Sequence, residues 1–205
     1  EMMKGDPCLY KDFESIRNEN YHLIHFKNGV FNTENAEFIT DEKFIRSRSF
    51  DYCMNIKFIE KPDITQARTW NYLLQSSLQA EPDSTKARLA YELIAYVVCR
   101  NTTAEKAVIL YGDSGSGKSL MCSLIESAFS PQDVTAFDLK YLGSKTWSIK
   151  FKNISVAICR EIPTKALSSI DILKSVITCE KITGEEKYAI SESFVPHCKL
   201  VMAGN

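Results

Sequence analysis

Apolar residues form nearly unbroken runs of strand length in the second half of the chain. These runs lie at residues 107–111, 154–159 and 200–203. Runs of this kind are typical of strands that are covered on both faces, as the central strands of parallel sheets are. We therefore expect each run to form a buried strand, including the run at 107–111.

Helical patterns separate these runs. Apolar residues recur at helical spacing over 120–129, up to a serine–proline pair at 130–131, and again over 170–177, after a serine pair at 168–169. Strands that alternate with helices in this way form parallel sheets covered by helices. The pattern predicts an α/β core with a mostly parallel sheet over residues 105–205.

The first half of the chain has a different pattern. Apolar residues on both sides of Asn28-Gly29 predict a β-hairpin over 21–40, because this pair is typical of two-residue hairpin turns. A short extended segment is expected at 50–60. Together with two helices that follow, these elements predict an α+β segment over residues 1–104, ahead of the core.

The two helices have their own start signals. The first is predicted to begin at Pro62-Asp63, with Asp63 as its cap, and the second at Pro82-Asp83-Ser84. Helical spacing assigns one apolar stripe to each helix. The stripes comprise Ala67, Trp70, Leu74 and Leu78 in the first helix, and Leu89, Leu93, Ile94, Val97 and Val98 in the second.

Composition and charge exclude several classes of protein. The 25 basic and 26 acidic residues give a net charge of −1, and 44% of the residues are hydrophobic. Disordered chains combine low hydrophobicity with high net charge, and wholly basic nucleic-acid binders have an excess of lysine and arginine. Neither description fits this chain. A local basic surface is compatible with the balance of charge.

The absence of targeting segments and the spacing of the cysteines predict an intracellular protein. The sequence has no run of about 18 apolar residues and no apolar signal-peptide core, so we expect neither a membrane segment nor secretion. The seven cysteines are dispersed and form no Cys-x-x-Cys pair, which favours reduced thiols over a zinc or redox site.

A glycine-rich loop carries the strongest chemical signal. Residues 112–119, Gly-Asp-Ser-Gly-Ser-Gly-Lys-Ser, fit the phosphate-loop pattern G-x-x-x-x-G-K-[ST] at every fixed position. Glycines let backbone N–H groups surround a phosphate, and the helix that follows directs its positive end at the same phosphate. We expect ATP and Mg²⁺ here, with Lys118 at the β- and γ-phosphates and the Ser119 hydroxyl on the metal. The predicted nucleotide ligands are Gly112, Asp113, Ser114, Gly115, Ser116, Gly117, Lys118 and Ser119.

Two polar residues follow predicted strands. Glu161 comes just after the strand at 154–159, and Asn205 follows the strand at 200–203. In phosphate-loop ATPases, a carboxylate at the end of a neighbouring strand holds Mg²⁺ or polarises the attacking water. We assign this role to Glu161, against the alternative of a solvated glutamate. Asn205 is assigned to sensing the γ-phosphate, against the alternative of an ordinary Gly-Asn turn.

Residues 139–160 contain basic residues and no acid. The stretch contains Lys140, Lys145, Lys150, Lys152 and Arg160, interleaved with Tyr141, Trp147 and Phe151. Basic and aromatic residues together bind single-stranded nucleic acid through phosphate contacts and stacking. Alternatively, Trp147 and Phe151 are core residues with solvated lysines between them, because large aromatic side chains are commonly buried. The sequence leaves both interpretations open.

The ordered set of motifs resembles the superfamily 3 helicases, the AAA+-type motors of small viruses, phages and plasmids. The set comprises the loop at 112–119, Glu161 and Asn205. Residues 26–32, Phe-Lys-Asn-Gly-Val-Phe-Asn, look like a segment of the phage, plasmid and poxvirus-type primase-helicases. Residues 183–188, Thr-Gly-Glu-Glu-Lys-Tyr, are similar to the segment that precedes their third motif.

This resemblance implies a P-loop NTPase core of AAA+ type. The implied activity is that of an ATP-dependent DNA helicase motor in the replication of a virus, phage or plasmid. The implied assembly is a homo-hexameric ring with single-stranded DNA in its channel. A hairpin at 181–188 would project into that channel, with Lys181 and Lys187 on the DNA phosphates, unless it is an ordinary exposed hairpin. Residues 189–190 and 194–195 are expected to flank short strands.

The sequence also departs from the family's pattern. Arg160 precedes Glu161 where some relatives carry two acids, and Glu185 follows Gly184 where aspartate is usual. No arginine of this chain can be assigned as the arginine finger, so we expect a motor truncated after the third motif. Two alternatives stay open: an ATP-binding but inactive or regulatory relative, and a P-loop kinase of a small molecule, which would require an arginine-rich lid.

Overall fold

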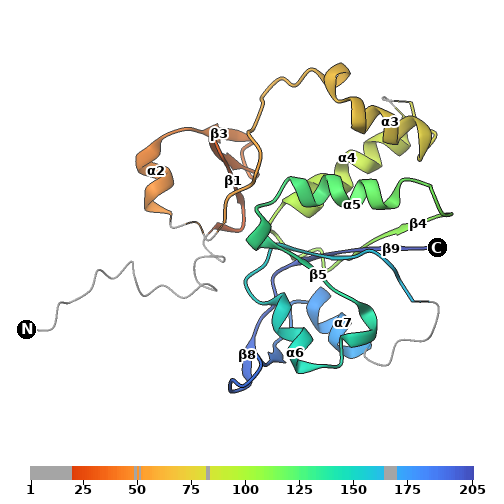
Figure 1. Ribbon diagram of the computed structural model, residues 1–205. Coiled ribbons are helices and arrows are strands. Elements are labelled where there is room, and N and C mark those ends of the chain that lie inside the picture. Colours follow the sequence, from red (N-terminus) through yellow and green to blue (C-terminus); the bar gives the residue numbers. More distant parts are fainter. Residues whose placement is uncertain (1–19, 49, 51, 82–83, 164–169) are drawn as a thin grey trace, which may run out of the picture.

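The computed structural model describes residues 20–48, 50, 52–81, 84–163 and 170–205 (Figure 1). Within them, the strands form a four-stranded parallel sheet, a three-stranded antiparallel sheet and a two-stranded hairpin. The fold is therefore mixed α/β with a parallel central sheet, as the alternation of strands and helices predicts. The expected helix starts at Pro82-Asp83 and Ser168-Ser169 lie outside the described residues.

The central sheet has the strand order β4-β9-β6-β5. Its strands are β4 (Val108–Tyr111), β5 (Val134–Ala136), β6 (Val156–Cys159) and β9 (Lys199–Gly204). Every residue of β6 and β9 is buried, which confirms the covered strands predicted at these two runs. The short strand β5 has no apolar run of its own, and the sequence pattern does not predict it.

The expectation of a covered central strand is wrong for the run at 107–111. Among the described residues β4 pairs with β9 alone, so it lies at an edge of the sheet. Ile109 is 59% exposed and Tyr111 is 82% exposed. An apolar run favours a strand but does not specify which strands lie beside it, and therefore could not place β4.

Helices cover both faces of the central sheet (Figure 1). They are α4 (Thr85–Val98), α5 (Lys118–Ser127), α6 (Lys145–Ser148) and α7 (Ile170–Ile177). Side chains alternate along β6, so Val156 and Ile158 join one buried cluster with α4 and α5, whereas Ala157 and Cys159 join another with α7. The first cluster also includes Phe26, from the N-terminal half. The proposed division into residues 1–104 and 105–205 stays a prediction.

The N-terminal sheet is an antiparallel meander of β1 (Leu23–Phe26), β2 (Gly29–Asn32) and β3 (Glu37–Ile39), followed by α2 (Glu42–Ser47). The hairpin predicted over 21–40 is confirmed, and β3 adds a third strand. The turn lies one residue earlier than predicted, because Phe26 pairs with Gly29 and leaves Lys27 and Asn28 as the loop. Gly29 begins β2 instead, and a Cβ there would lie 2.6 Å from the Ile39 carbonyl oxygen.

The described residues of the segment expected at 50–60, namely 50 and 52–60, run beside the meander without forming a strand. The Met54 N–H donates to the His25 carbonyl at 2.7 Å, and the Lys27 N–H donates to the Ile56 carbonyl at 3.1 Å. Phe58 then stacks on Phe38, with ring centroids 4.5 Å apart. These contacts hold the segment against the meander.

The helix predicted at Asp63 begins later than expected. Asp63 caps the short 3-10 turn η2 (Ile64–Gln66), where its carboxylate accepts a hydrogen bond from the Thr65 N–H at 3.1 Å. Helix α3 follows at Arg68–Ser76 without a side-chain cap. Asp63 therefore acts as a cap, but it caps the 3-10 turn that precedes α3 and not α3 itself.

Helix α4 begins after Ser84, whose hydroxyl accepts a hydrogen bond from the Ala87 N–H at 3.2 Å. The predicted apolar stripe is correct for Val97 and wrong for Leu89, which is 64% exposed. Small residues mark the inner face instead, since Ala87 and Ala90 are buried in a cluster with Leu74 of α3. The spacing of large apolar residues predicts which face of a helix is buried, but it overlooks a buried face that is formed by alanines.

The hairpin of β7 (Ile182–Gly184) and β8 (Glu192–Phe194) lies beside α6 (Figure 1). Its backbone is tied to that helix by the Glu185 N–H, which donates to the Lys145 carbonyl at 3.1 Å. Residues 189–190, expected to flank a short strand, lie in the loop just before β8, and Phe194 ends that strand. Three 3-10 turns complete this region: η3 (Pro131–Asp133), η4 (Leu139–Tyr141) and η5 (Ile149–Phe151).

Candidate functional site

Three strands of the central sheet end at the same edge because they are parallel. β4 leads into the loop at 112–117, β6 leads into Arg160 and Glu161, and β9 leads into Asn205. β9 lies between the other two strands, so Asn205 follows the middle one. Ligands of open parallel sheets bind outside the carboxyl ends of the strands, which makes this edge the candidate site.

The glycine-rich loop passes directly into α5. Gly117 is the N-cap of α5, with a φ of 83°, in the left-handed region that favours glycine. A Cβ at Gly117 would lie 2.2 Å from the Ser77 hydroxyl oxygen, so the end of α3 packs closely on the loop. The first N–H groups of a helix have no carbonyl partner in the helix, and this end of α5 can therefore receive an anion.

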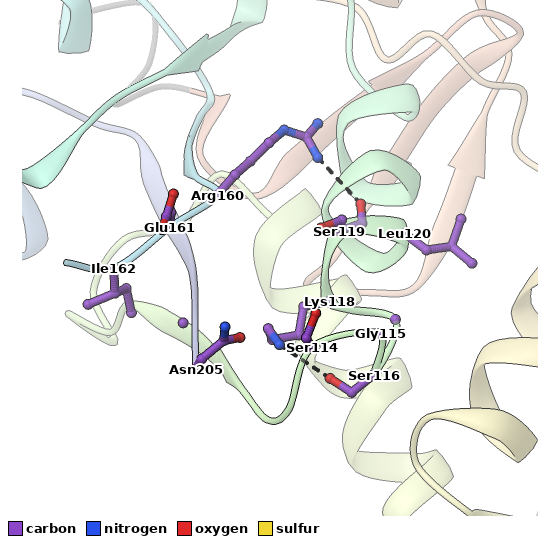
Figure 2. Close-up of a pocket in the computed structure, with 12 residues that line it drawn as sticks. Ser114, Gly115, Ser116, Lys118, Ser119, Leu120, Arg160, Glu161, Ile162 and Asn205 are labelled. Atoms are coloured by element: carbon purple, nitrogen blue, oxygen red, sulfur yellow. Dashed lines mark hydrogen bonds between the residues drawn. The ribbon is translucent and has the colours of Figure 1, made fainter. Parts of the chain in front are cut away.

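The side chain of Lys118 folds back over the loop. Its ammonium donates to the carbonyl oxygens of Gly112 at 2.6 Å and Asp113 at 2.7 Å. It also lies 3.4 Å from the Ser116 hydroxyl (Figure 2). Each of these partners is a neutral oxygen. A negatively charged phosphate oxygen would form a stronger, charge-assisted bond with the same ammonium.

A cavity of about 510 Å³ opens between the loop and the ends of β6 and β9 (Figure 2). We call it the loop pocket; it is lined by residues 114–120, 160–162, 204 and 205. The fold thus brings Glu161 and Asn205 to the same cavity as Lys118 and Ser119. Their catalytic and binding roles stay predictions.

Backbone contacts fix Glu161 and Asn205 relative to each other. The Ile162 N–H donates to the Ala203 carbonyl at 2.8 Å, which extends the pairing of β6 with β9 past the end of β6. The Ile162 side chain also packs against Gly204. Glu161 and Asn205 are both exposed, so a ligand in the loop pocket can reach them.

Arg160 is a residue of the loop pocket that the sequence did not assign to the nucleotide site. One guanidinium nitrogen lies 3.4 Å from the Ser119 carbonyl oxygen (Figure 2). The same nitrogen lies 3.4 Å from the Ser123 hydroxyl, and the other lies 2.5 Å from the Glu126 carboxylate. The side chain therefore links the end of β6 to α5. Its position directly before Glu161 was the available signal.

A second cavity of about 420 Å³ adjoins the loop pocket through Ser116, Gly117 and Lys118. Gly112 and Asp113, predicted as nucleotide ligands, line this second cavity and not the loop pocket. Its other walls are mostly apolar side chains of α3, the turn after α3, β4 and α5, namely Leu73, Leu78, Ile109, Leu110, Tyr111 and Met121.

The donors in the loop pocket fit Mg²⁺. Ser119 offers a hydroxyl and Glu161 a carboxylate, and both line the cavity. Mg²⁺ prefers oxygen ligands and, beside a nucleotide, takes one or two from the protein and the rest from phosphates and water. In the part of the chain that the structure describes, no group of three or more His, Cys, Asp or Glu residues is placed to hold a metal ion.

The residues predicted to contact DNA lie outside the loop pocket. Lys181 precedes β7 and Lys187 lies in the loop between β7 and β8, and both are exposed. The same loop presents Tyr188, which is fully exposed, and Ile190, which is 93% exposed. Sequence reasoning missed the two apolar side chains, although such residues are unusual in a charged turn. No helix among the described residues is long and apolar enough to span a membrane.

Comparison with known proteins gives a match to a family model and similarity to solved structures. Residues 110–205, which contain the loop pocket, match the model of a family of unknown function (DUF5906). No curated protein matches the sequence.

Among solved structures, the chain is similar to the C-terminal region of NrS-1. One apo structure of that region has a TM-score of 0.53 and 16% identity, covering 73% of this chain and 38% of its own length. Another apo structure, described like the first as an A form, has a TM-score of 0.51 and 17% identity, covering 67% of this chain and 32% of its own length. A third has a TM-score of 0.50 and 18% identity, covering 72% and 35%. This chain thus spans about a third of the structures it matches, and the likeness concerns the fold.

Proposed function

We propose that this chain binds and hydrolyses ATP with Mg²⁺, as the motor part of a DNA helicase in the replication of a virus, phage or plasmid. The observation that carries the proposal is the loop pocket. A phosphate-loop sequence, a carboxylate and an asparagine, from three different strand ends, line one cavity. The likeness to the superfamily 3 helicases in the order of these motifs supports the choice of motor over other ATP-binding proteins.

Residues of the loop pocket have proposed roles in ATP binding or hydrolysis that follow from their positions. Backbone N–H groups of the loop and of α5 hold the phosphates, and Lys118 exchanges the carbonyls of Gly112 and Asp113 for phosphate oxygens. Ser119 and Glu161 would hold Mg²⁺, which neutralises phosphate charge when bound. Glu161 also accepts a proton from the water that attacks the γ-phosphorus, as the bond to the bridging oxygen breaks. Asn205 orients that water.

The adjoining cavity is the proposed site of the nucleotide base. It shares Ser116, Gly117 and Lys118 with the loop pocket, so a single ligand can occupy both cavities. Apolar walls with a few polar groups are typical of pockets for flat organic ligands. The bound base would then contact Ile109 and Tyr111, which are exposed on the outer side of β4.

The proposed partner is single-stranded DNA in the channel of a homo-hexameric ring. Support for the DNA contact comes from the exposed loop between β7 and β8, which combines Lys187 with Tyr188. A lysine can contact a phosphate while a tyrosine stacks on a base. Lys181 lies at the foot of the same hairpin.

ATP binding and hydrolysis, each measured with and without single-stranded DNA, test the proposal. We expect binding that needs Lys118, turnover that needs Glu161, and stimulation by DNA. Lys118→Ala should lose binding, and Glu161→Gln should bind but not hydrolyse. Lys86→Ala, on the exposed surface of α4, is the control and should behave as the unmodified protein.

Other outcomes would favour the alternatives. Binding without hydrolysis, with or without DNA, would identify an inactive or regulatory relative. Rapid phosphate transfer to a small acceptor in the absence of DNA would identify a kinase. Absence of ATP binding would overturn the proposal altogether.

A further inference from the structure

Two aromatic rings on the α6 side of the molecule stack at the surface. The rings of Tyr141, from η4, and Trp147, from α6, have centroids 4.8 Å apart and an interplanar angle of 22°. Tyr141 is 43% exposed and Trp147 is half-buried. Phe151, in the same basic stretch, is a buried core residue, whereas Trp147 is not among the residues of that core cluster. The core interpretation is therefore correct for Phe151 and wrong for Trp147.

Two lysines contact this aromatic pair, and a third lies nearby in the chain. The Lys150 ammonium lies 3.7 Å from the centroid of the Trp147 ring, and the Lys140 ammonium lies 4.7 Å from that of Tyr141. Lys145 is exposed at the start of α6. Lys140 also pairs with Asp138 at 2.7 Å. Neither Lys145 nor Lys150 forms an ion pair with any described residue, so the surface keeps a positive charge.

The chain segment around Trp147 contacts the β7–β8 hairpin at the two ends of its loop. The Lys145 carbonyl accepts the Glu185 N–H at 3.1 Å, and the Lys152 ammonium lies 2.6 Å from the Glu192 carboxylate of β8. A strand of nucleic acid that contacts the loop of the hairpin could therefore continue onto Tyr141 and Trp147.

We infer that Tyr141, Trp147, Lys145 and Lys150 form a binding surface for single-stranded DNA. The inference deepens the proposed function and rests on its choice of DNA as partner. A base stacks on the Trp147 ring in place of the Lys150 ammonium, because stacking of a base is worth more than a cation–π contact at an exposed site. The displaced ammonium then contacts a neighbouring phosphate. Paired bases of a duplex do not offer their faces to these rings.

Tryptophan fluorescence can report this stacking directly. The chain has two tryptophans, so Trp70→Phe leaves Trp147 as the only one. In this background we expect oligo(dT) to quench the fluorescence without nucleotide present, and a duplex of equal length to quench it far less. Lys145→Ala with Lys150→Ala should weaken oligo(dT) binding about tenfold and reduce the slope of log affinity against log salt by about 1.4, since each phosphate contact on a single strand contributes about 0.7.

Two further variants separate binding at this surface from a general effect of charge or of misfolding. Lys57→Ala with Lys86→Ala removes the same charge from exposed positions outside this surface and should leave binding unchanged. Tyr141→Ala removes the ring that stacks on Trp147 and should weaken the quenching, while the circular dichroism spectrum stays the same. Quenching that is absent in the single-tryptophan protein, equal for duplex, or unaffected by the Lys145 and Lys150 changes would overturn the inference. ATP binding is measured separately, so a failure of the loop pocket is distinguishable from a failure of this surface.

Discussion

The guanidinium of Arg160 lies 2.5 Å from the carboxylate of Glu126 and so links the end of β6 to α5. Ser119, Ser123 and Glu126 all face Arg160, because residues three and four apart lie on one side of a helix. Arg160 directly precedes Glu161. The link therefore joins the two chain segments that carry the proposed Mg²⁺ ligands, Ser119 and Glu161.

Arg160→Ala should impair turnover more than stability. The side chains of Arg160 and Glu126 are 44% and 48% exposed, and exposed ion pairs contribute about 0–1 kcal/mol to the free energy of unfolding. Residues that orient metal ligands commonly matter about 10–100-fold for metal affinity or activity. We expect ATP hydrolysis to need about tenfold more Mg²⁺. Titrating hydrolysis with Mg²⁺ measures this, and the swapped pair Glu126→Arg with Arg160→Glu should recover part of the loss.

Gly117→Ala should destabilise the protein more than Gly115→Ala. Both glycines have φ near 80°, so each alanine adds backbone strain of about 1–3 kcal/mol. A Cβ at Gly117 would also lie 2.2 Å from the Ser77 hydroxyl oxygen, whereas a Cβ at Gly115 meets no atom within 4 Å. Urea unfolding of the two variants gives the comparison. Equal losses of stability would show that α3 does not pack against the loop in solution.

Lys199 should make stability rise with pH above 8. The side chain is 3% exposed, and burial lowers the pKa of Lys199 to about 8 although the Tyr96 ring and the Asn101 carbonyl contact its ammonium. The unfolded chain keeps this proton up to about pH 10.5, so it binds more protons between these values, and folding gains up to about 3 kcal/mol as pH rises through this range.

The difference between Lys199→Met and the unmodified protein isolates this effect. Burial raises the thiol pKa of Cys122 and Cys159, which lowers stability at high pH, but equally in both proteins. In urea unfolding from pH 7 to 10, Lys199→Met should therefore lack the rise. Parallel pH curves for the two proteins would contradict the prediction.

Asn28→Ala should loosen the segment at 55–58 from the meander. The Asn28 amide donates to the Phe58 carbonyl at 3.0 Å, and its side-chain oxygen accepts the Phe58 N–H at 2.8 Å. Two lost hydrogen bonds at an exposed position predict about 1–2 kcal/mol less stability. Urea unfolding measures the loss. Asn55→Ala serves as the control, because the Asn55 side chain forms no hydrogen bond among the described residues. The stability of this variant should equal that of the unmodified protein.

Local chemistry made several elements predictable. The runs that became β6 and β9 are apolar throughout, and burial on both faces is what such runs require. Ser84, the last residue of the predicted start at Pro82-Asp83-Ser84, caps α4, because capping depends only on residues within one turn of the helix start. Asn28-Gly29 marked a hairpin correctly, but the register shifted by one residue, since the close approach of β3 to Gly29 is not encoded in the turn pair itself.

The sequence by itself determined the parallel core, the phosphate-loop pattern and the polar residues at the strand ends, because each depends on neighbours in the chain. Only the tertiary structure decided that β9 lies between β4 and β6, and thereby which side chains share the loop pocket. It also placed β4 at an edge, bound Arg160 to α5 and stacked Trp147 on Tyr141 at the surface. Strand order and side-chain partners depend on packing between segments far apart in the chain, which periodicity and spacing cannot specify.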